Sequence, residues 1–131
     1  VQDRRIQDVM RCQRVEERFI LGRDLGLKAG FNMGGGKEMP AAVRQRLISS
    51  AIQAIDQVFN WRVVEQDYVR MYRQNYSPEQ LDYILELCQQ PAHRQLMSVE
   101  VQMIDDALAI GENYSAQVQE ATAKAFQDAL R

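Results

Sequence analysis

The chain has 131 residues, of which 46% are hydrophobic and 26% charged, and this length and composition favour one folded domain over two or over a disordered chain. Its net charge of -2 is uneven: residues 1–73 carry 13 basic and 9 acidic side chains, and residues 74–131 carry 3 and 9. The basic side chains are interspersed with acidic ones and lack stacking aromatics, so nucleic acid is not an expected partner.

No apolar run reaches the roughly 20 residues that a membrane-spanning helix needs, so we expect no membrane span. The chain begins with Val1 rather than Met, which fits the removal of an upstream segment such as a secretory signal peptide.

Helical periodicity runs along the whole chain without a convincing strand pattern, and predicts a single all-α domain, a compact bundle of about five helices. The first helix is expected over residues 3–21 and presents a broad apolar face. Six glycines between residues 22 and 36 then predict a flexible connection, with Phe31 and Met33 as its apolar middle. The second helix is expected from Pro40 to Phe59.

Two capping signals delimit the next helices. Asn60 is expected to cap a third helix that ends near Tyr76. Ser77, Pro78 and Gln80 then form the pattern of a capping box with proline in the first turn, which predicts a short helix over residues 78–89.

A fifth helix is expected from Pro91 to near the C-terminus, either long or broken at Gly111. Helical spacing predicts that one set of its apolar residues faces inward: Leu96, Met103, Ala107, Tyr114, Val118, Ala121 and Ala125.

The sequence contains no recognisable catalytic or cofactor site. Its single histidine, His93, lies in the first turn of a predicted helix, and with two distant cysteines it does not make a familiar zinc-binding spacing. The serines lack the context of a nucleophile elbow. The glycine triplet before Lys37 departs from a phosphate-binding loop, because Phe31 and Glu38 occupy essential positions. We therefore expect no enzyme activity, metal or cofactor.

The second half of the chain resembles the proteobacterial domain-of-unknown-function family 2059. The resemblance covers residues 61–109, about two fifths of the chain, and includes Trp61 and Tyr72. Its motifs are Ser77-Pro78-Glu79-Gln80-Leu81, the short apolar helix, Gln90-Pro91 with the His93-Arg94-Gln95-Leu96 that follows, and Gln102-Met103.

This resemblance implies a helical protein exported to the periplasm or secreted after removal of a signal peptide, with no shared activity established. In such an oxidising compartment, Cys12 and Cys88 could join the first helix to the fourth by a disulfide. The alternative is two buried free thiols.

The remaining interpretation is that the protein acts by binding another molecule. Phe31 and Met33 could form an interaction loop that contacts a protein partner, or they could pack into the core. We expect an exported protein of uncharacterised function that acts through protein contacts. The first alternative is a carrier of a lipid or other apolar ligand between helices, and an unrecognised hydrolase is the second.

Overall fold

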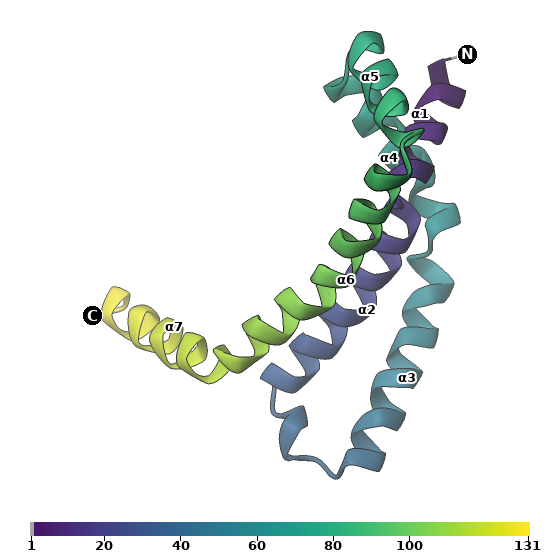
Figure 1. Ribbon diagram of the computed structural model, residues 1–131. Coiled ribbons are helices and arrows are strands. Elements are labelled where there is room, and N and C mark those ends of the chain that lie inside the picture. Colours follow the sequence, from purple (N-terminus) through teal and green to yellow (C-terminus); the bar gives the residue numbers. More distant parts are fainter. Residues whose placement is uncertain (1) are drawn as a thin grey trace.

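The computed structural model describes the backbone of residues 2–131 and the side chains from Arg4 onward, and that part of the chain is all-α without a strand. Seven α-helices and a short 3-10 helix, η1, follow one another in Figure 1. They are α1 (Gln2–Cys12), α2 (Val15–Met33), η1 (Gly36–Glu38), α3 (Ala41–Val58), α4 (Trp61–Asn75), α5 (Pro78–Cys88), α6 (Pro91–Asn113) and α7 (Ser115–Ala129).

The buried core lies at one end of the molecule, where α1, α4, α5 and the start of α2 meet (Figure 1). Ile6 and Leu81 are fully buried there, and Trp61, Tyr68 and Tyr76 pack around its edge. Burying a large apolar side chain stabilises the folded state by about 1.5–3 kcal/mol, so this cluster is the main source of stability. Its members are Ile6, Val9, Met10, Val15, Val69, Tyr72 and Leu81.

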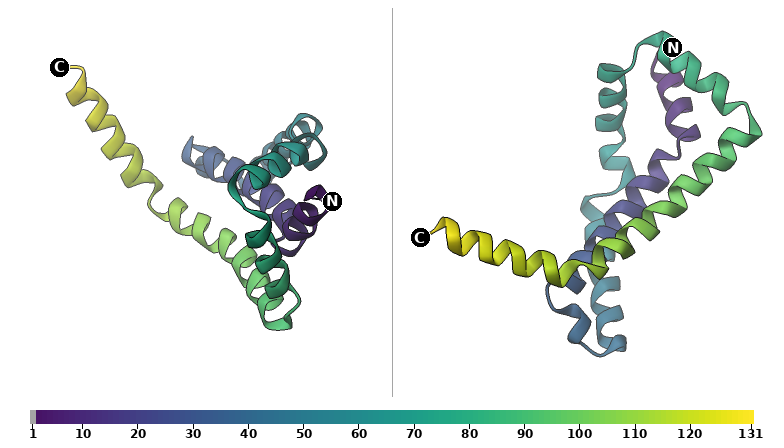
Figure 2. Two further views of the ribbon diagram at one scale, coloured as in Figure 1. Left: turned by 90° about the horizontal axis from the view of Figure 1, so that it is seen from above. Right: turned by 60° about the vertical axis from the view of Figure 1, so that its left-hand side comes forward.

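Helix α2 leads from this core along the length of the molecule, with α3 on one side and α6 on another (Figures 1 and 2). Helices α2 and α6 run in the same direction, and α3 runs back against α2. At the far end, α7 points away from the other helices. The bundle is therefore more open than the compact one expected.

The first predicted helix is two helices. α1 ends at Cys12, and α2 begins at Val15 after a kink in which Arg14 adopts the left-handed conformation, with φ 56° and ψ 44°. This conformation costs a residue with a side chain about 1–2 kcal/mol, so neighbouring contacts must hold it. Apolar periodicity continues through the kink, which explains why the pattern did not reveal it.

The flexible connection expected after residue 21 was also wrong. Helix α2 continues to Met33, and Gly22, Gly26 and Gly30 lie within it on its exposed side. Packing of the other faces against α3 and α6 outweighs the poor helix propensity of glycine, which is about 1 kcal/mol per residue. The turn itself begins at Gly34, and Gly35 supplies its positive φ of 101°.

The capping predictions were confirmed. The Asn60 side chain accepts a hydrogen bond from the Val63 amide, and Ser77 and Gln80 make both bonds of the capping box. The C-terminal helix is broken, but Gly111 is helical and the break falls at Tyr114. None of the described helices is both long and apolar enough to cross a membrane.

Alanine substitutions at two glycines test the extended α2. No atom lies within 4 Å of a Cβ built on Gly26, so Gly26→Ala should raise the free energy of unfolding by about 0.5–1 kcal/mol. Gly36 is the contrasting control, because its Cβ would lie 2.3 Å from Phe31 Cδ1 and Gly36→Ala should destabilise. Urea denaturation measures both. A destabilising Gly26→Ala would contradict a continuous helix.

Candidate functional site

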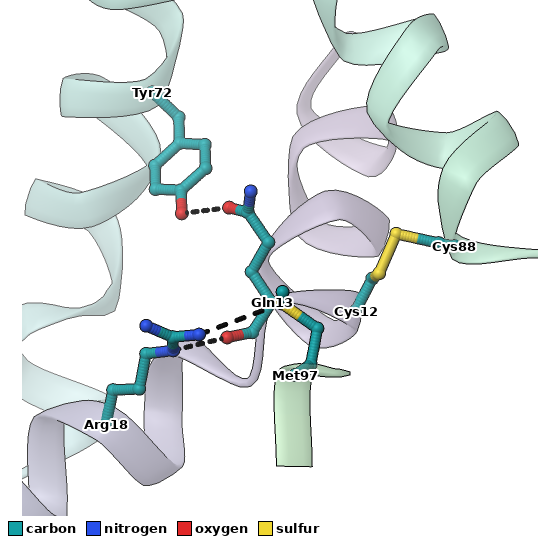
Figure 3. The surroundings of a disulfide bond; sticks show 6 residues. All are labelled: Cys12, Gln13, Arg18, Tyr72, Cys88 and Met97. Carbon is teal, nitrogen blue, oxygen red and sulfur yellow. Dashed lines mark hydrogen bonds between the residues drawn. A yellow bond between two sulfur atoms is a disulfide. The ribbon is translucent and has the colours of Figure 1, made fainter. Parts of the chain in front are cut away.

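The kink between α1 and α2 is held by side chains from α2 itself and from α4 (Figure 3). The Gln13 carbonyl, which leaves the helical pattern at the kink, accepts a hydrogen bond of 2.8 Å from Arg18 Nε. The Gln13 side-chain oxygen accepts one of 2.6 Å from the Tyr72 hydroxyl on α4. These bonds satisfy groups that the kink would otherwise leave without partners.

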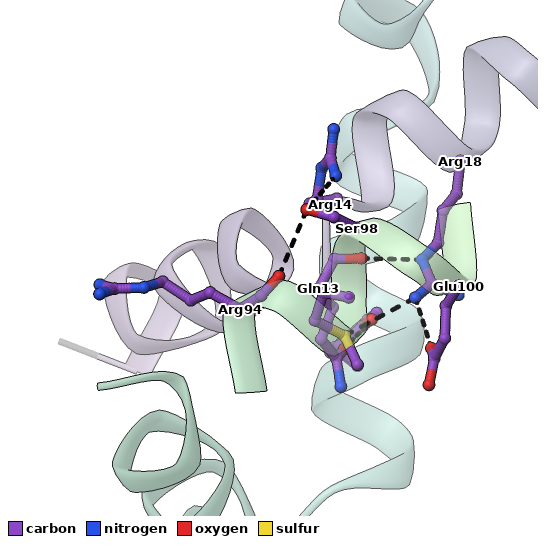
Figure 4. Close-up of polar contacts among 8 residues, drawn as sticks. Gln13, Arg14, Arg18, Arg94, Ser98 and Glu100 are labelled. Atoms are coloured by element: carbon purple, nitrogen blue, oxygen red, sulfur yellow. Dashed lines mark hydrogen bonds and ion pairs between the residues drawn. The ribbon is translucent and has the colours of Figure 1, made fainter. Parts of the chain in front are cut away.

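Arg14 and Arg18 then hold α6 from both flanks (Figure 4). Arg14 donates to Ser98 Oγ at 2.9 Å, and Arg18 pairs with Glu100 at 2.8 Å. Arg18 also lies 3.7 Å from the sulfur of Met97, which is buried between the two polar contacts. The two arginines therefore support the packing of the Met97 face of α6 against α2.

Arg14 is also paired with Glu17 in its own helix, through Nε at 2.8 Å from Oε1 and through a second bond from Nη2 to Oε2. The hydrogen bond from Arg14 lowers the pKa of the Glu17 carboxyl, and the same bond raises the pKa of Arg14. This ionic pair helps to hold Arg14 in its left-handed conformation.

A disulfide joins Cys12 at the end of α1 to Cys88 at the end of α5 (Figure 3). The two Cα atoms are 6.0 Å apart, within the usual range for this bond. The single histidine lies beside it: the sulfur atoms and a ring nitrogen of His93 are all within 4.8 Å of one another. The fold thus brings together three residues whose sequence spacing indicated no site.

A cavity of about 370 Å³ adjoins the disulfide and is open to solvent. Arginines contribute much of its polar wall, and one of them, Arg11, is paired with Asp8 at 3.1 Å. The cavity is lined by Asp8, Arg11, Cys12, Arg14, Cys88, Arg94 and Ser98.

Helix α6 has two apolar faces. The inner face lies against α2 and consists of Met97, Val101, Ile104 and Leu108, which are buried or half-buried. The outer face, called here the α6 seam, is exposed and consists of Leu96, Val99, Met103, Ala107 and Ile110. The four large seam side chains are between 55% and 60% exposed.

The position of the seam shows that the predicted inward face of this helix was wrong. Leu96, Met103 and Ala107 are exposed, and the residues that follow them in sequence face α2 instead. The predicted inward residues beyond α6, which are Tyr114, Val118, Ala121 and Ala125, are exposed too. Both stripes have helical periodicity, so spacing alone does not decide which one is buried.

The structure places the predicted interaction loop inside a helix. Phe31 and Met33 form the end of α2, and both are half-buried. Phe31 packs against Gly36, and the Met33 carbonyl accepts a hydrogen bond from the Gln119 side chain of α7. A role for these residues in binding stays a prediction, but the flexible loop on which it was based is absent from this segment.

No protein-family model, no curated protein and no solved structure matches the chain. The resemblance of residues 61–109 to family 2059 therefore remains a prediction.

The disulfide should contribute strongly to stability. Its cysteines are 76 residues apart, and closing a loop of that length stabilises by roughly 4 kcal/mol in the chain-entropy model. Urea denaturation of the native protein with and without reductant should show a loss of this size. The double variant Cys12→Ser/Cys88→Ser should be equally destabilised and should not respond to reductant. A loss below about 1 kcal/mol would contradict the pairing as a major constraint.

The burial of Tyr72 leads us to predict that the folded state loses stability at alkaline pH. Burial raises the pKa of its hydroxyl to about 12, above the value of 10.0 expected in the unfolded chain. Between these two values the unfolded chain loses a proton that the folded chain keeps, so stability falls as pH rises. Well below pH 10 the residue contributes no pH dependence, because it is protonated in both states. In Tyr72→Phe, denaturation midpoints measured from pH 9 to 11 should fall less steeply than in the native protein; equal slopes would exclude Tyr72 as the cause.

Proposed function

We propose that this protein acts outside the cytoplasm by binding a helix of a partner protein along the α6 seam. The observation that carries the proposal is the second apolar face of α6, which follows a spacing of 3, 4, 4 and 3 residues from Leu96 to Ile110. Helices that pack on one another present apolar residues at this spacing. Contiguous exposed apolar surface of this kind marks interaction sites in soluble proteins.

The seam is held in a defined orientation before a partner arrives. The inner face of α6 packs on α2, and the contacts from Arg14 and Arg18 add to this packing. A rigid helix loses little conformational entropy on binding, which favours affinity.

Charge indicates the chemistry of the partner. Between Pro91 and Arg131 there are six acidic and three basic side chains. Asp106 flanks the seam on one side, and Glu100, which is paired with Arg18, flanks it on the other. A partner helix with an apolar stripe bordered by lysine or arginine would be complementary. A second copy of this chain would bring acidic flanks together, so a different protein is the better fit.

The location is supported by the disulfide, because such bonds persist in oxidising compartments and are rare in the cytosol. The other interpretations have less support. All cysteines are paired, which leaves no thiol as a nucleophile. A cavity of about 350 Å³ beside Tyr76 and Ile84 has a mostly apolar lining. It is open to solvent and would leave an apolar ligand partly exposed.

Site-specific photocrosslinking in the native host tests the proposal. A photoreactive residue at Met103 should capture one protein of defined mass, and the same residue at Gln102, exposed but about 100° away around the helix, should not. Capture of a second copy would contradict a basic-flanked partner, and equal capture at both positions would contradict the seam.

A substitution at the seam gives the size of the effect. Ile110 is 60% exposed, so Ile110→Glu should leave the thermal midpoint nearly unchanged. It should lower partner affinity by at least about tenfold, because burying an isoleucine contributes about 1.5–3 kcal/mol and the glutamate adds a desolvation cost. Ile110→Leu is the matched control and should keep affinity within about threefold. Unchanged binding by Ile110→Glu, measured by titration calorimetry with the captured partner, would reject this surface.

A further inference from the structure

The end of α1, the end of α5 and the first turn of α6 bring together three side chains that are ligands of zinc. Cys12 closes α1, Cys88 closes α5 and His93 lies in the first turn of α6. Their sulfur and nitrogen atoms lie within 4.8 Å of one another, and all three residues are half-buried. Once the bond between the two sulfur atoms is reduced, three such donors are the protein share of a tetrahedral site with one open position.

Two of the three donors come from one tight turn. Cys88 and His93 are separated by four residues, which include Pro91 at the start of α6. Backbone bonds from Gln90 N to Leu87 O and from His93 N to Gln90 O hold the turn. These contacts do not depend on the disulfide, so Cys88 and His93 remain close to each other when it is reduced.

The third donor is held by core packing. Cys12 follows Val9 and Met10, which are buried in the core, and α1 packs along α5. Cys12 is therefore kept beside Cys88 by apolar contacts as well as by the covalent bond.

We propose that the reduced protein binds one Zn²⁺ through Cys12 Sγ, Cys88 Sγ and a ring nitrogen of His93, with water in the fourth position. Thiolate and imidazole ligands favour zinc over magnesium or calcium. This inference does not rest on the proposed function: Zn²⁺ binds only where a thiol reductant has opened the Cys12–Cys88 bond, whereas the proposed partner helix binds the oxidised protein.

The disulfide and the metal exclude each other. Two molecules of a thiol such as glutathione reduce the Cys12–Cys88 bond, giving two cysteine thiols and one glutathione disulfide. Zn²⁺ then replaces the two thiol protons, which are released to water. Oxidation by a small disulfide reverses the exchange: the bond between the two sulfur atoms forms again, the oxidant is reduced to two thiols, and Zn²⁺ leaves.

The surroundings are compatible with this ion. The open cavity whose wall includes both cysteines offers a path from solvent. The cavity also has Arg11, Arg14 and Arg94 in its wall, which would oppose a bare dication. Zn²⁺ with two thiolates and a neutral imidazole has no net charge, so the completed site does not repel these arginines.

Cobalt titration tests the site directly, because Co²⁺ occupies zinc sites and reports its ligands by absorption. Protein reduced with dithiothreitol and freed of it under argon should bind one equivalent of Co²⁺. The spectrum should show the strong visible bands of tetrahedral cobalt and a near-ultraviolet thiolate-to-cobalt band, and one equivalent of Zn²⁺ should abolish both. Oxidised protein should show neither. Absence of these bands in the reduced protein would overturn the proposal.

Variants identify the ligands. His93→Gln should weaken Co²⁺ binding by more than about tenfold, since even second-sphere changes at zinc sites cost 10–100-fold. His93→Cys should restore binding and strengthen the thiolate-to-cobalt band. Gln95→Ala, exposed and two residues farther along α6, is the matched control and should bind as the native protein does. Equal affinity of His93→Gln and the native protein would overturn the three-residue site.

If the reduced protein loses helicity without metal, circular dichroism measures whether Zn²⁺ restores it. One equivalent of Zn²⁺ should then restore the helical signal of the native protein but not of His93→Gln. A reduced chain that stays unfolded with Zn²⁺ would contradict the site.

Discussion

The Cys12–Cys88 bond is the constraint on which the rest of the arrangement depends. It joins the ends of α1 and α5, and α2 and α6 begin three residues after the two cysteines. The bond therefore sets side by side the starting points of the two longest helices, which then run in the same direction. The fold is open away from the core, so a covalent tie at this point replaces apolar contacts that a compact bundle would supply.

Apolar packing and polar contacts together determine what the paired helices expose. The α6 seam and the inner face of α6 have the same kind of apolar residue, and three inner residues, Met97, Ile104 and Leu108, directly follow seam residues in the sequence. The contacts of Arg18 with Glu100 and of Arg14 with Ser98 add to the apolar packing of the inner face on α2. Because the inner face is buried against α2, the seam is left in solvent, where it is available to a partner.

The sequence predicted the features that depend on local chemistry. Capping by Asn60 and by the Ser77 box was readable because each cap involves side chains within three residues of the amides they satisfy. The pairing of Cys12 with Cys88 was an open alternative, since both residues were predicted on apolar faces, where buried free thiols are equally at home, and the oxidising compartment was itself an expectation.

Features set by distant contacts were missed. The kink at Arg14 depends on bonds from α2, α4 and α6 to neighbouring residues, and α2 continues past its glycines because other helices pack on it. His93 lies beside the cysteines because of the turn after α5. The spacing of the two cysteines in the sequence does not reveal this position. The only local signal was the four-residue separation of Cys88 and His93.

One chemical property follows from this arrangement whatever the partner proves to be. Cys12 and Cys88 are kept adjacent by α1 packing on α5, so their pairing should be intramolecular and complete. Peptide mapping of the folded monomer after mild oxidation, without a reduction step, is the most direct test. We predict a single linked peptide pair containing Cys12 and Cys88, from protein of monomer mass. Disulfide-linked dimers, or two thiols that stay free, would contradict the adjacency and with it the placement of α2 beside α6.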